Sequence, residues 1–181
     1  AMAGYTAYLK IDGFNILPVL SISMAVTTFT GQNVGAKNLK RVKKGMYDAL
    51  IMCTIYTVLT GVFLLSLSHQ ILSLFTNDSA VIEYGQLAMK YFCPFYFLLG
   101  ILNTLAGTVR GAGKGVPPML ILLFSMCIFR IFWIKLALPF FSTIDGIFML
   151  YPISWSVGMI MMIIYTRYGK WLPQENKRKL D

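Results

Sequence analysis

Charged residues are scarce in this chain, and acidic side chains are the scarcest. Only 13% of the 181 residues are charged, with 7 Asp and Glu against 16 Lys and Arg, whereas a soluble domain averages about 25% charged residues. The 3 Cys lie inside apolar stretches and the chain has a single His, so we expect neither a metal site nor a disulfide framework. This composition argues against a water-soluble globular domain.

Positive charge is missing from two connecting segments, residues 69–83 and 139–146. Cytoplasmic loops of multi-pass membrane proteins carry an excess of Lys and Arg, and the loops on the other side do not. The alternation of basic clusters with segments that lack Lys and Arg therefore predicts a multi-pass protein of the cell membrane, with residues 172–181 as a cytoplasmic tail. Because apolar spans divide the charge, we expect membrane lipid as a partner and no nucleic acid. Twelve of the 16 basic residues form three clusters: Lys37, Lys40, Arg41, Lys43 and Lys44; Arg110 and Lys114; and Arg167, Lys170, Lys177, Arg178 and Lys179.

Five apolar stretches are long enough to cross a bilayer as helices, because a hydrocarbon core of ~30 Å needs about 20 apolar residues. None of them alternates polar and apolar residues as a β-barrel strand does, and helices are then the structure that lipid permits. We therefore predict an all-α membrane protein, a polytopic bundle of about five transmembrane helices. The spans are expected near residues 4–34, 45–68, 79–109, 116–138 and 144–167.

Proline and capping residues predict where these spans begin or bend. Pro18 and Pro94 lie inside the first and third spans, where each removes a backbone hydrogen bond and is expected to bend its helix. Pro117 and Pro118 open the fourth span. Backbone N–H groups in the first turn of a helix make no hydrogen bond within the helix, so proline is tolerated there. Asp78 lies in a turn just before the third span and is expected to cap it.

Ionisable residues inside the spans are the candidates for function, because a charge in lipid is costly and usually faces a cavity or a partner. A rise of about 1.5 Å per residue puts Arg130 slightly past the middle of the membrane and the others in its outer half. Two interpretations remain open. Asp12, Lys90 and Arg130 line a polar cavity that binds substrate or a coupling ion, or they form a satisfied ion pair with snorkelling neighbours. Asn103 either lines the same pathway or bonds to a neighbouring helix. The ionisable set is Lys10, Asp12, Lys90, Arg130 and Lys135.

Two glycine-bearing stretches end the first and third spans. Small residues permit close helix packing and a sharp exit turn, and the cations that follow anchor to anionic headgroups. The second stretch has the look of a phosphate-binding loop, but no β-strand precedes it and the Walker spacing is absent. We therefore assign both stretches a structural role. Their residues are Gly31, Gln32, Asn33 and Gly35, and Arg110, Gly111 and Gly113.

Four stretches resemble the multidrug and toxic compound extrusion (MATE) family of efflux transporters: residues 7–18, 29–36, 109–118 and 151–155. The resemblance implies a fold of twelve helices in two six-helix lobes, of which residues 1–171 match the C-terminal lobe without its first helix. It also implies secondary active efflux of a cationic or amphiphilic compound, driven by sodium ions or protons through alternating access. Such transport makes and breaks no bond, so we expect no enzyme activity, no catalytic residue and no cofactor besides the coupling ion.

The resemblance supplies no coupling residue. Family members place the coupling acid in the N-terminal lobe or on the seventh and tenth helices, and the tenth corresponds here to residues 79–109, whose acid is Glu83 at the outer end. Asp12 is therefore inferred from its own position inside a span. Two alternatives stay open: a flippase of related architecture for lipid-linked headgroups, and a non-transporting membrane module. The expected partner is the missing N-terminal lobe or a second copy of this chain.

Overall fold

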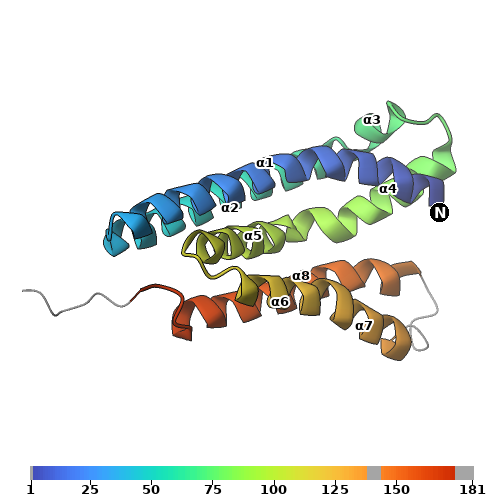
Figure 1. Ribbon diagram of the computed structural model, residues 1–181. Helices are drawn as coiled ribbons and strands as arrows, with labels where there is room; N and C mark the ends of the chain where they lie inside the picture. Colours follow the sequence, from blue (N-terminus) through green and yellow to red (C-terminus); the bar gives the residue numbers. More distant parts are fainter. Residues whose placement is uncertain (1, 138–143, 174–181) are drawn as a thin grey trace, which may run out of the picture.

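Helices make up all the regular secondary structure of the described chain, which comprises residues 2–137 and 144–173 of the computed structural model. This confirms the predicted all-α fold for those residues. Most of the expected cytoplasmic tail, from residue 174 onward, and the end of the fourth expected span at residue 138 lie outside the described residues. The elements are α1 (Met2–Gly35), α2 (Leu39–Ser66), α3 (Ser68–Ser73), α4 (Ser79–Phe92), a 3-10 turn (Cys93–Phe95), α5 (Tyr96–Gly111), α6 (Val116–Leu123), a π-helical segment (Phe124–Ile128), α7 (Phe129–Ala137) and α8 (Ile144–Tyr168) (Figure 1).

Five helical stretches are long and apolar enough to cross a membrane, which agrees with the number expected from the sequence. Two of them contain an interruption. The third stretch joins α4 to α5 through the 3-10 turn, and the fourth joins α6 to α7 through the π-helical segment. The five stretches are Tyr8–Gly35, Leu39–Ser66, Ser79–Gly111, Val116–Lys135 and Phe148–Tyr168.

Local sequence signals account for several helix ends and for one interruption. Asp78 caps α4, its Oδ1 accepting a backbone N–H bond at 3.0 Å, and Pro117 and Pro118 lie in the first turn of α6, as predicted. Pro94 lies in the 3-10 turn that separates α4 from α5, because proline cannot donate the hydrogen bond that a continuous helix needs at that position. Pro18, in contrast, lies within the single helix α1.

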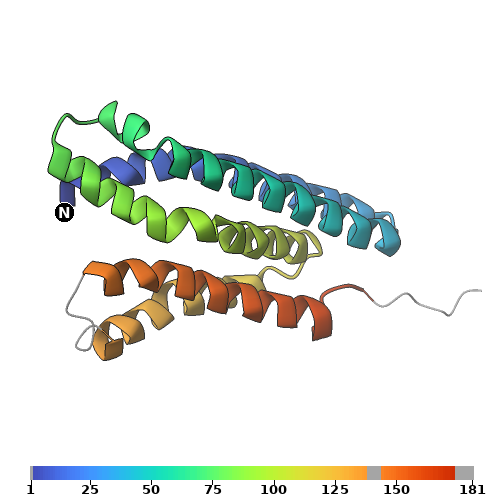
Figure 2. The same ribbon diagram turned by 180° about the vertical axis from the view of Figure 1, so that it is seen from behind.

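Helix α5 occupies the centre of the bundle. Figures 1 and 2 show α1 and α2 on one side of α5, and α6 and α8 on the other. Most of α5 between Tyr96 and Val109 is therefore buried. The α1–α2 turn, the α5–α6 loop and the C-terminal end of α8 lie at the same end of the bundle (Figure 1). The basic residues beside these three segments consequently gather at one end, as expected for a cytoplasmic face.

The contact between α1 and α5 is close because glycines form it. A Cβ atom at Gly111 would overlap the carbonyl oxygen of Thr27, and one at Gly31 would lie 3.4 Å from the carbonyl oxygen of Gly111. The Thr27 hydroxyl also donates to the Gly107 carbonyl at 2.9 Å. Small interfacial residues and interhelical hydrogen bonds are what hold helices together in lipid. The two glycine-bearing stretches thus meet each other across α1 and α5.

Candidate functional site

A carboxylate and two phenols form a compact cluster where α1 meets the start of α5. The Tyr96 hydroxyl donates to Asp12 Oδ1 at 2.6 Å, and the Tyr8 hydroxyl donates to the same oxygen at 3.2 Å. The two hydroxyl oxygens are themselves 2.7 Å apart. Tyr8 precedes Asp12 by one helical turn, so both face the same way. Tyr96 is the first residue of α5, directly after the interruption in the third span.

Aromatic packing fixes the two phenol rings. Tyr8 stacks on Phe92 of α4 with ring centroids 5.0 Å apart, and Tyr96 stacks on Trp155 of α8 at 6.2 Å. Both tyrosines are only 3% exposed, whereas Asp12 is partly buried. A carboxylate that is rigidly held on one side and accessible on the other can exchange a proton or a cation.

Arg130 makes its contacts elsewhere, on α8. Its Nε donates to Ser154 Oγ at 3.2 Å, and its guanidinium carbon lies 4.4 Å from the centre of the Tyr151 ring. Trp155 contacts both Tyr151 and Tyr96, so an aromatic layer lies between Arg130 and the Asp12 cluster. The hydrogen bonds to the Asp12 carboxylate come from Tyr96 and Tyr8 instead. The structure therefore does not bring Asp12 and Arg130 together.

Lys90 and Asn103 also lie apart from Asp12. Lys90 is exposed in the last turn of α4 and lines a pocket of about 260 Å³ that Glu83 also lines. The Asn103 side chain donates to the Leu99 carbonyl at 2.9 Å, within its own helix. Of the four candidates for ion or substrate binding, Asp12 alone belongs to the tyrosine cluster.

The end of α1 shows how the first glycine-bearing stretch is used. Asn33 donates from its side chain to the Phe29 carbonyl at 2.7 Å, and Gln32 is exposed. A Cβ atom at Gly35 would meet nothing within 4 Å. The left-handed turn residue is Lys37, with φ of 58°. The sharp exit expected from a glycine is therefore made two residues later by a lysine.

The end of α5 follows the expected pattern more closely. Gly113, two residues after the end of α5, has φ of +80°, a conformation that glycine adopts without steric cost. The Arg110 guanidinium donates to Ser23 Oγ of α1 at 3.2 Å, and Ser23 in turn donates to the Asn103 carbonyl at 2.8 Å. These two hydrogen bonds join α1 to α5.

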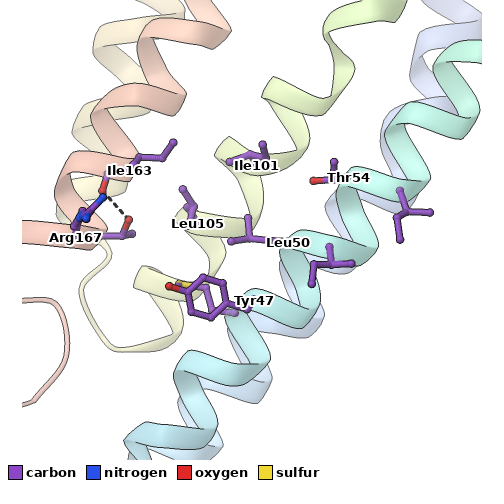
Figure 3. Close-up of a pocket in the computed structure, with 11 residues that line it drawn as sticks. Tyr47, Leu50, Thr54, Ile101, Leu105, Ile163 and Arg167 are labelled. Carbon is purple, nitrogen blue, oxygen red and sulfur yellow. Dashed lines mark hydrogen bonds between the residues drawn. The ribbon is translucent and has the colours of Figure 1, made fainter.

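A groove of about 700 Å³ lies between α2, α5 and α8, in the half of the bundle that carries the basic loops (Figure 3). Leu50, Ile101 and Leu105 give it an apolar wall, and Arg167 of α8 provides a cation. Its lining includes no carboxylate and no member of the Asp12 cluster. The groove is therefore mainly apolar and separate from the Asp12 cluster.

Residues 1–134 match the model of the MatE family. This chain belongs to that family. It is 28% identical over 172 residues to a probable multidrug resistance protein NorM of Thermotoga maritima, covering 95% of this chain and 36% of that protein. It is 26% identical over 176 residues to a probable multidrug resistance protein YpnP of Bacillus subtilis, covering 94% and 38%. A MATE transporter solved in an inward-facing conformation shares the fold, with a TM-score of 0.74, 16% identity and coverage of 92% and 38%.

This MATE chain therefore spans less than two fifths of the length of these relatives. The comparisons confirm the predicted family, and the apolar helices identify a multi-pass membrane protein.

Sequence reasoning selected Asp12 but missed Tyr8 and Tyr96. The i, i+4 spacing from Tyr8 to Asp12 was a usable signal. Nothing in the sequence indicated Tyr96, because its position depends on how α5 packs against α1.

Proposed function

We propose that this chain forms part of a secondary active multidrug efflux transporter, and that Asp12 with Tyr8 and Tyr96 binds its coupling ion. Membership of the MATE family and relatives named as multidrug resistance proteins support the transport class. The observation that carries the site is the Asp12 carboxylate, inside a span and bonded at 2.6 Å to a residue of another span. Intramembrane carboxylates of this kind commonly serve ion pathways.

The bond from Tyr96 to Asp12 joins α1 to the first residue after the interruption in the third span. Transporters place ion sites at broken helices, where backbone groups are released from the helical pattern. Binding of a sodium ion or a proton changes the charge of Asp12 and hence the strength of both tyrosine bonds. An ion that binds one arrangement of α1 and α5 more tightly shifts the population toward it. We propose that this shift drives alternating access.

The other candidates take secondary roles in this proposal. Arg130 holds α7 to α8 beside the π-helical segment, a distortion that is frequent at functional sites. Lys90, exposed on α4, is a proposed contact for substrate or lipid headgroups. Asn103, whose carbonyl accepts from α1, is a proposed packing residue.

A complete transporter needs more than this lobe. The chain covers 36–38% of its relatives, so we propose that an N-terminal lobe or a second copy of the chain supplies the other wall of the pathway. The proposed substrate is a small cationic or amphiphilic compound. The proposed orientation has the C-terminus in the cytoplasm, since the basic loops gather at the end of the bundle where α8 ends.

Drug resistance in an efflux-deficient bacterium tests the proposal. The protein that carries this chain is expressed with Asp12→Asn, which retains hydrogen-bonding capacity but has no charge. We expect resistance to ethidium to fall to the level of cells without the transporter, at unchanged membrane abundance. Asp48→Asn, which removes an exposed carboxylate of α2, is the matched control and retains resistance. Full resistance in the Asp12→Asn strain would reject the assignment of the site.

A further inference from the structure

The groove between α2, α5 and α8 takes no part in the proposed ion site (Figure 3). Its inner wall includes Met46 of α2 and Leu105 of α5, which are both buried. Its outer edges are apolar yet exposed, and they include Ile51 of α2 and Ile163 of α8. Its volume of about 700 Å³ lies within the usual range of ligand pockets, about 300–1,000 Å³. The groove is therefore open along the side of the bundle and large enough for a bound molecule.

The length of the groove matches the depth of one lipid leaflet. Its lining on α2 extends from Met46 to Ile55, roughly 13 Å at about 1.5 Å per residue. Half of a hydrocarbon core of ~30 Å is about 15 Å. On α8 the lining reaches Arg167, in the last turn of that helix and beside the basic loops. The groove therefore runs from the basic end of the bundle toward the middle of the membrane, as an acyl chain does.

Positive charge lies at the basic end of this groove. Arg167 is exposed and is the charged residue of the lining. Lys43, also exposed, precedes Tyr47 by four residues and Leu50 by seven, so it lies on the same face of α2, one turn nearer the loop. Asp48 follows Tyr47 directly and therefore points about 100° away around the helix. The end of the groove thus offers a cation from each of two helices.

We infer that this groove binds an anionic phospholipid of the leaflet nearest the basic loops. One acyl chain lies along Leu50 and Ile101. The phosphate lies between Arg167 and Lys43, because basic pockets between transmembrane helices bind anionic headgroups and a guanidinium matches the geometry of a phosphate. The exposed Tyr47 sits at the headgroup level, where tyrosine is enriched. The proposed topology makes this the cytoplasmic leaflet, and only that assignment rests on the proposed function.

Charge and shape together select this class of ligand. A cationic amphiphile fits the apolar wall but meets like charge at Arg167. Phosphatidylcholine has no net charge, so its attraction to two cations is weaker. Glycerol phosphate has the negative charge but no chain to bury against the wall. An anionic phospholipid satisfies both halves of the groove, and it stabilises the arrangement of α2, α5 and α8 because it contacts all three helices at once.

Native mass spectrometry of the purified protein that carries this chain tests the inference, because it resolves bound lipids by mass. Phosphatidylglycerol should bind more tightly than phosphatidylcholine, and glycerol phosphate at the same concentration should not displace it. Arg167→Gln and Lys43→Gln should each weaken the tightest phosphatidylglycerol binding about fivefold, the effect of one basic residue at an anionic surface. Lys114→Gln, which removes an exposed cation of the α5–α6 loop at the same end, is the matched control and should bind like the wild type.

Filling the groove tests the acyl chain separately from the headgroup. Ile101→Trp places an indole in the groove and should abolish the tightest binding, whereas Ile134→Trp, at an exposed position of α7, should leave it unchanged. If Ile101→Trp does not purify as a folded protein, Arg167→Gln decides the result.

Equal affinity for phosphatidylglycerol and phosphatidylcholine would overturn the inference, and so would unchanged binding in Arg167→Gln. Displacement of the bound lipid by ethidium would assign the groove to substrate instead and would also overturn it. These measurements use no ion gradient and do not involve Asp12. Their failure would therefore leave the proposed function intact, whereas full drug resistance in the Asp12→Asn strain would reject the proposed ion site and leave the lipid site standing.

Discussion

Adding one methyl group at Gly111 should separate α1 from α5. The new Cβ atom would overlap the Thr27 carbonyl and lie 2.8 Å from the Thr30 Cβ. Both obstacles belong to the backbone or to a branched side chain of a rigid helix, so α1 as a whole has to move. The movement also stretches two interhelical bonds, from Thr27 to Gly107 at 2.9 Å and from Ser23 to Asn103 at 2.8 Å.

The size of the effect follows from these contacts. Overpacking costs about 1–3 kcal/mol, and an interhelical hydrogen bond in a membrane protein is worth about 0.6–1.7 kcal/mol. Gly111 is the last residue of α5, so replacing it by alanine returns at most about 1 kcal/mol of helix propensity. Gly111→Ala should therefore lower the free energy of unfolding by about 1–4 kcal/mol. Gly35→Ala is the matched control, because its Cβ would meet nothing within 4 Å.

Thermal unfolding of the purified protein in detergent measures this difference. Gly111→Ala should lower the midpoint temperature by roughly 2–16 °C at this chain length, and Gly35→Ala should leave it unchanged or raise it slightly. Equal midpoints for the two variants would refute the close α1–α5 contact. A larger loss in Gly35→Ala than in Gly111→Ala would show that the packed glycine has been misidentified.

Two further predictions concern the cation of α7 and the end of α5. Arg130→Gln removes the guanidinium from the Tyr151 ring and should lower the unfolding free energy by about 1–3 kcal/mol, without changing which ion gradient drives ethidium transport. Lys135 is exposed on the same helix, so Lys135→Gln is the control and should not change the unfolding free energy. Equal stability of the two variants would contradict the Arg130 contacts. Gly113→Ala places a side chain at φ of +80° and should lower the unfolding free energy by about 1–2 kcal/mol, measured by the same thermal unfolding. Gly115→Ala is the control and should leave the midpoint temperature unchanged. Identical midpoints for the two variants would argue against the left-handed turn.

Much of the fold was predictable because the bilayer imposes simple rules on a sequence. The lengths of the apolar stretches predicted the five spans. The positions of Lys and Arg along the chain predicted which loops lie together at one end of the bundle. Asp78, Pro117 and Pro118 marked helix starts through local chemistry, which needs no tertiary information. The π-helical segment was not predictable, because nothing in its five residues, Phe124–Ile128, differs in kind from the α-helical residues around it.

The site was only partly predictable, for a geometric reason. Counting residues along a helix gives the depth of Asp12 and Arg130 in the membrane, but not the direction in which each side chain points. Two charges at similar depth can face different neighbours, and here Asp12 faces Tyr96 whereas Arg130 faces Tyr151. The rotation of α5 that brings Tyr96 to α1 is set by the packing of many residues, which one sequence does not reveal.

Proton release on substrate binding tests the coupling at Asp12 most directly. Tetraphenylphosphonium is added to the purified protein in weakly buffered detergent solution, and the change in pH is followed with an indicator dye. With Asp12 as the proposed ion site and a proton as the proposed coupling ion, the wild-type protein should release protons as it binds the cation. Asp12→Asn should release none. Equal proton release by the two proteins, or none by the wild type while it binds the cation, would contradict the account.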